Sequence, residues 1–194
     1  EVQKQTEVLN NHYNSLDLEH YSPSDLEKLS TTLAIALESL KNASNLEEVS
    51  VIVSSALKTM NEAHNFKAEY DAIIKEITDA LDAAVNETLA KDEWFKKFDL
   101  ANKKEIILNN LTKEDKYTVY ANSATYIDSA KKELNDYLTE LNSLYSAINT
   151  AIDTIKAFDT SREGAKALID EYVEKVKDAL DTENVNKIQN EFEQ

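Results

Sequence analysis

The residues of this chain that could do chemistry are mainly carboxylates, together with three histidines and nine tyrosines. The 194-residue sequence contains no cysteine, which excludes disulfides, thiolate catalysis and cysteine-ligated zinc. Zinc-binding histidines on one helix usually stand three or four residues apart, whereas His12, His20 and His64 are spread along the chain. We therefore expect scattered surface histidines and no metal site.

Catalysis by carboxylates is also not indicated. Neighbouring acids such as Asp92 and Glu93 are expected by chance in a chain with 37 Asp and Glu residues. A catalytic pair needs a desolvated cleft that separates its two pKa values, and no pattern points to one. The single glycine, Gly164, cannot supply a glycine-rich phosphate loop, and the Glu-x-x-His motif of di-iron bundles does not occur. We predict that the protein is not an enzyme and holds no cofactor.

Three aromatic residues close together, Trp94, Phe95 and Phe98, are the strongest local candidate for a binding site. Exposed, they would anchor a protein partner, because tryptophan is enriched at interface hot spots. Alternatively, Trp94 and Phe98 lie four residues apart and would fill the end of a helical core, as helical aromatics usually do. We favour the core interpretation and keep the three residues as candidate partner-binding residues.

The elements that must position these residues are helices. One glycine and one proline are too few for a protein with many tight turns. Residues 1–64 predict three helices of an up-down-up bundle, and Ser22 or Ser24 and then Asn45 can cap the second and third. The second helix presents leucines at spacings of three and four, which place them on one face: Leu26, Leu29, Leu33, Leu37 and Leu40.

Residues 65–194 predict a second bundle with longer helices. Apolar residues alternate spacings of three and four from Ile127 to Phe158, which is a heptad seam, so we expect a long helix near 113–158. Further helices are expected at about 66–90, 91–110 and 162–180, with a short one at the end. The predicted fold is thus all-α, with elongated tandem helical bundles. Because these helices can cover the seam, we expect the isolated chain to be monomeric.

The charge of the chain limits its partners. The net charge of −16 divides into −6 for residues 1–65, −3 for 66–112 and −7 for 113–194. No segment is basic, so nucleic acid and anionic lipid surfaces would be repelled. No apolar run approaches the ~20 residues of a membrane span, so we expect no membrane insertion.

The start of the second helix resembles a known repeat. The stretch Tyr21-Ser22-Pro23-Ser24-Asp25-Leu26, followed by Leu29, Leu33 and Ala36, resembles the FIVAR-type repeat of Gram-positive surface proteins. The turn at 41–49 is also similar, whereas Asp25 and Leu26 replace the family's usual serine and tryptophan. The resemblance covers residues 1–64 and implies a three-helix bundle within a large cell-wall-attached or secreted protein. Such repeats act as spacers or adhesive modules, and some bind host matrix proteins.

These observations predict a non-enzymatic, extracellular or cell-surface module of a larger bacterial surface protein. It would act as a spacer, an adhesin or an assembly domain, with a protein partner or a host matrix component. The alternative is a secreted helical carrier of a lipid or small apolar ligand, which would need wide apolar faces around a cavity. The apolar stripes here are narrow, so we rank the carrier lower.

Overall fold

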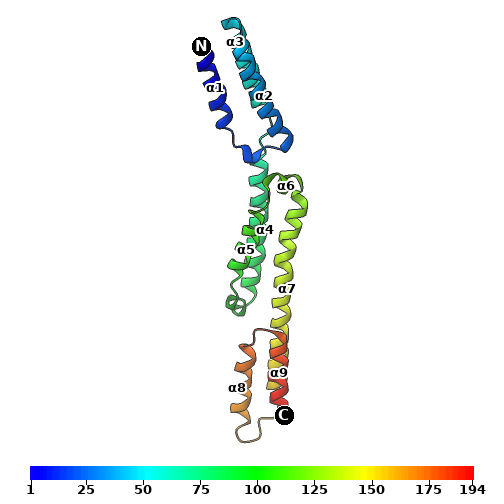
Figure 1. The fold of residues 1–194 in the computed structure, drawn as a ribbon. Coiled ribbons are helices and arrows are strands. Elements are labelled where there is room, and N and C mark those ends of the chain that lie inside the picture. The colour runs from blue at the N-terminus through cyan, green and yellow to red at the C-terminus, as the bar shows by residue number, and fades with distance from the viewer. The chain divides into compact units, whose positions relative to one another are not determined.

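The computed structural model describes all 194 residues and confirms the predicted all-α class. It contains nine α-helices and two short 3₁₀ helices (Figure 1). The only strand-like pairing is a single antiparallel bridge between Tyr21 and Asn65. No helix combines the length and the apolar composition needed to cross a membrane.

The chain forms two compact units. Unit 1 comprises residues 1–80 and 106–129, and unit 2 comprises residues 81–105 and 130–194. The boundary expected after residue 64 therefore lies inside unit 1. Three helices contribute residues to both units, namely α4 (Lys67–Lys91), α5 (Leu100–Leu111) and α7 (Ser123–Lys156).

Unit 1 begins with three helices that pack on one another: α1 (Val2–Asn14), α2 (Pro23–Asn42) and α3 (Leu46–Asn61) (Figure 1). The 3₁₀ helix η1 (Leu18–His20) joins the first two. Their shared core contains one buried residue of α1 and five of α2 and α3: Leu9, Ala36, Leu40, Val49, Val53 and Ala56. Because the apolar stripes of all three helices meet there, burial of these stripes stabilises the bundle.

Local signals set where α2 and α3 begin. The Ser22 hydroxyl accepts a hydrogen bond from the backbone N–H of Asp25 at 3.0 Å, and Pro23 occupies the first turn. The Asn45 side chain accepts from the N–H of Glu48 at 2.9 Å, and Glu48 in return accepts from the N–H of Ser44 at 2.7 Å. These contacts satisfy N–H groups that a helix start leaves without intrahelical partners.

An aromatic cluster lies in unit 1 where η1 meets the residue that precedes α4. Phe66, which is fully buried, stacks on Tyr120 with ring centroids 4.6 Å apart and meets His20 edge-on at 5.7 Å. Tyr120 and Tyr117 belong to the short helix α6 (Lys116–Ala121). The backbone N–H of Phe66 also donates to the carbonyl of His20 at 2.8 Å. The cluster thereby joins η1, α6 and the start of α4.

Unit 2 is built on the heptad seam of α7. The seam residues from Ala130 to Ile155 are buried, with one exception. The alternating spacing assigns Tyr137 to the seam, but its neighbour Leu138 is the buried residue there. Helices α8 (Ala165–Lys177) and α9 (Thr182–Glu193) add Ile169, Val173, Val176 and Val185 to the buried set.

Two predicted helices are divided in the structure. The expected helix 91–110 consists of the 3₁₀ helix η2 (Glu93–Lys97) followed by α5. The expected helix 113–158 is split at Asn122 into α6 and α7. Asn122 has non-helical backbone angles, and its side-chain amide donates to the carbonyl of Thr118 at 2.9 Å. Asparagine competes in this way for backbone groups and ends helices without glycine or proline.

Candidate protein-docking surface

The three aromatic residues proposed from the sequence lie in unit 2 at the turn between α4 and α5. Trp94 is 9% exposed and Phe95 is 1% exposed, while Phe98 is half-buried. The ring of Trp94 packs against those of Phe95 and Phe98, at 5.1 and 4.8 Å. Tyr145 of α7 covers the other side. Of the three candidates, only Phe98 has an edge that a partner could reach without rearrangement.

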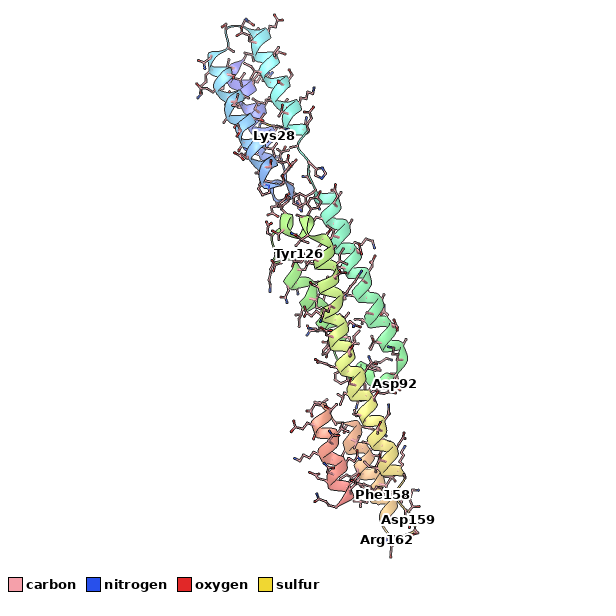
Figure 2. All side chains as sticks on the ribbon, turned by 90° about the vertical axis from the view of Figure 1, so that its right-hand side faces the viewer. Lys28, Asp92, Tyr126, Phe158, Asp159 and Arg162 are labelled. Atoms are coloured by element: carbon pink, nitrogen blue, oxygen red, sulfur yellow. The ribbon has the colours of Figure 1, made fainter.

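Asp92 lies directly before this aromatic turn and is hydrogen-bonded on both sides of it; Figure 2 labels its position. One carboxylate oxygen accepts from the backbone N–H of Trp94 at 2.8 Å, and the other accepts from the Tyr145 hydroxyl at 2.7 Å. The hydrogen bond from Tyr145, followed by the one from Trp94, lowers the pKa of Asp92. In the sequence, Asp92 is one of 37 acidic residues. An aspartate directly before a short helical turn is the capping signal that could have distinguished it.

The three histidines have different surroundings. His20 is buried, contrary to the expectation of surface histidines, and its Nδ1 lies 2.8 Å from a carboxylate oxygen of Asp17. Exposed His64 lies 3.1 Å from Glu69. His12 is half-buried, and its Nε2 has no hydrogen-bond partner. No cluster of three or more His, Asp or Glu side chains is arranged to hold a metal ion.

The strongest binding feature is a groove between α2 and α3 in unit 1, which we call the α2–α3 groove. Two large aliphatic side chains project beside it, Ile35 at 62% and Val51 at 60% exposure. The buried Ala36 and Ala56 form its floor. Its middle part encloses about 340 Å³ and is otherwise lined by small or half-buried side chains: Thr32, Ser39, Ile52, Ser55 and Thr59.

The groove continues toward the turn between α2 and α3, where its rim is acidic. Glu38, Glu47 and Glu48 line this wider part, which encloses about 740 Å³. Lys41 is paired with Glu38 at 3.0 Å, and its hydrogen bond lowers the pKa of Glu38. Glu47 forms no ion pair. The rim therefore keeps a negative charge that a partner can meet.

The groove was not predicted from the sequence, although the sequence contains a signal for it. Ile35 does not belong to the leucine ladder of α2, and Val51 lies outside the apolar stripe of α3. An aliphatic residue on the polar side of an amphipathic helix has no core to fill. Two such residues on adjacent helices could have indicated a shared exposed surface.

Comparison of the chain with protein-family models, curated proteins and solved structures found no match.

Proposed function

We propose that the chain is a non-enzymatic module of a larger bacterial surface protein that binds a partner protein through the α2–α3 groove. The observation that carries the proposal is the exposure of Ile35 and Val51 beside a floor of alanines. Exposed aliphatic side chains that lie together and have a polar surround are typical of interaction sites. The cell-surface or secreted setting, and the role as adhesin, spacer or assembly domain, rest on the resemblance of residues 1–64 to the FIVAR-type repeat.

The groove fits an α-helix of the partner. The lining residues of α2 extend from Thr32 to Asn42, which at 1.5 Å per residue corresponds to just under three helical turns, or roughly 15 Å. Small residues along the floor allow a helix backbone to approach closely. Ile35 and Val51 would then contact apolar residues at positions i, i+3, i+4 and i+7 of the partner.

Charge specifies the chemistry of that helix. The acidic rim favours an amphipathic helix whose polar flanks carry lysine or arginine. A second copy of this chain is a poor occupant, because docking groove on groove would bring two acidic rims together. The occupant that fits the groove best is therefore a basic amphipathic helix of another protein.

The proposal can be tested with two designed peptides. Both are 16-residue amphipathic helices with leucine at i, i+3, i+4 and i+7, and their polar flanks carry lysine in one and glutamate in the other. Fluorescence anisotropy with the full chain measures the dissociation constant of each. We expect the lysine peptide to bind at least tenfold more tightly and to weaken as salt rises. Equal binding of the two peptides would overturn the choice of partner.

Variants locate the site. Ile35→Asp combined with Val51→Asp removes about 1 kcal/mol of apolar contact at each position and places charge in the contact, so we expect at least a tenfold loss of affinity. Leu180→Asp is the control for each single exchange, Ile35→Asp and Val51→Asp, because Leu180 is 70% exposed and lies in unit 2. If the lysine peptide binds the double variant as tightly as the unchanged chain, the groove is not the site. The same variants can then be used to measure whether binding of the chain to immobilised host matrix proteins depends on the groove.

A further inference from the structure

A second concave site lies in unit 2 at the turn from α7 to α8, and we call it the α7–α8 pocket. Figure 2 shows Phe158, Asp159 and Arg162 together at this turn. The pocket encloses about 380 Å³, which is in the size range of small-ligand sites. Four further residues complete its lining: Ala165, Leu168, Ile169 and Phe192.

Five of the seven residues that line this pocket are apolar. Phe158 and Leu168 remain 44% and 47% exposed, although both are large hydrophobic residues. Phe192 of α9 meets the ring of Phe158 edge-on at 4.7 Å and so fixes one wall. Ile169 is buried beneath them. A small apolar group could therefore cover Phe158 and Leu168 without displacing the core of the unit.

Arg162 gives the pocket its polar specificity. It is the only arginine of the chain, and it forms no ion pair although 37 acidic residues are present. The one acid in the pocket lining, Asp159, is hydrogen-bonded to Ser161: its two oxygens accept from the backbone N–H and the hydroxyl of Ser161, at 2.8 and 2.7 Å. These hydrogen bonds lower the pKa of Asp159 and keep it ionised. The guanidinium is left with all its donors available.

We propose that the α7–α8 pocket binds a small apolar carboxylic acid. Its hydrocarbon part would cover Phe158 and Leu168, and its carboxylate would accept two parallel hydrogen bonds from Arg162. The planar guanidinium matches a carboxylate in this bidentate manner, which a lysine cannot do. Because the whole chain carries −16, its long-range field repels anions. Binding must therefore come from this direct contact and from apolar burial.

The probes for this proposal are octanoate and its uncharged analogue octanamide. The full chain, labelled with ¹⁵N, is titrated with each while amide shifts are followed by NMR. We expect octanoate to shift the resonances of residues 158–169 and to bind at least tenfold more tightly than octanamide. Equal affinity for the two probes, or no shift of these resonances by octanoate, would overturn the proposal.

Variants separate the role of Arg162 from that of positive charge in general. Arg162→Gln should lower the affinity for octanoate about tenfold and leave that for octanamide unchanged within about twofold. The control is Lys166→Gln, which removes the same charge from an exposed residue of α8 outside the pocket lining. Leu168→Ala should lower the affinity for both octanoate and octanamide, because it removes apolar contact. If Lys166→Gln lowers the affinity for octanoate as much as Arg162→Gln does, the effect comes from net charge and the proposed contact with Arg162 is wrong.

Discussion

Replacing Phe66 by alanine should destabilise unit 1 more than any exchange at an exposed position. The Phe66 side chain is fully buried, stacks on Tyr120 with an interplanar angle of 10°, and also lies against His20 and Tyr117. The substitution would remove the ring at the place where η1, α6 and α4 meet. The remaining residues are helical and leave little freedom to fill the space.

The expected magnitude follows from these contacts. Burial of a whole phenylalanine side chain contributes about 2–3 kcal/mol, and well-placed aromatic pairs add about 0.5–1.5 kcal/mol each. With the closest pair, Phe66 on Tyr120, counted in full, the loss is about 4 kcal/mol, within the range of Phe→Ala substitutions in cores. Phe66→Leu retains most of the apolar volume and should cost about 1.5 kcal/mol.

Urea unfolding followed by far-UV circular dichroism measures the free energy of unfolding of the unchanged chain and both variants. An unchanged slope against urea would show that the same surface is exposed in each case. Trp94 is the only tryptophan and lies in unit 2, so its fluorescence without urea checks that unit 2 is folded in every variant. A loss below about 1.5 kcal/mol for Phe66→Ala, or equal losses for the two variants, would refute the account of this cluster.

Three further outcomes are expected. Asn45→Ala removes the side-chain cap of α3 and should lower the free energy of unfolding by about 1 kcal/mol in the same urea experiment. Tyr145→Phe removes the main cause that lowers the pKa of Asp92, so its pKa, followed by carboxyl NMR, should rise toward its ordinary value. A lowered carboxyl pKa contributes stability that is lost as pH falls through it, so the loss of stability below about pH 4 should become shallower in this variant. Gly164→Ala should lower the free energy of unfolding by about 1 kcal/mol, because φ at this position is +83°, although nothing lies within 4 Å of the added carbon. Gly164→Asn should lower it less, and equal stability of all three chains would contradict this explanation.

Helices α2 and α3 could be predicted from the sequence because each has both a side-chain cap and an apolar stripe, whereas α1 has only a stripe. Ser22 and Asn45 cap α2 and α3, and the structure places Leu29 and Leu40 of the ladder in the core. The division at Asn122 could not be predicted in this way. Asparagine is tolerated within helices, and whether it ends one depends on what its neighbours pack against.

The candidate sites were harder to predict than the fold, since a binding surface depends on which positions the core leaves uncovered. Trp94 and Phe98 drew attention by their type, but Tyr145, far away in sequence, covers Trp94. Ile35 and Val51 become neighbours only when α2 and α3 pack together. Periodicity identifies the buried face of each helix and leaves the pairing of exposed faces undetermined.

The bridge between Tyr21 and Asn65, with the hydrogen bond from Phe66 to the His20 carbonyl, has a mechanical consequence. Tension between η1 and α4 passes directly across these contacts and leaves α2 and α3 unstretched. Once the contacts break, residues 21–65 can extend by up to about 150 Å, at roughly 3.3–3.6 Å per residue. The α2–α3 groove therefore lies on a stretch of chain that carries no tension while these contacts hold. After they break, tension reaches α2 and α3, and their full extension would disassemble the groove together with the shared core around Leu9 and Leu40.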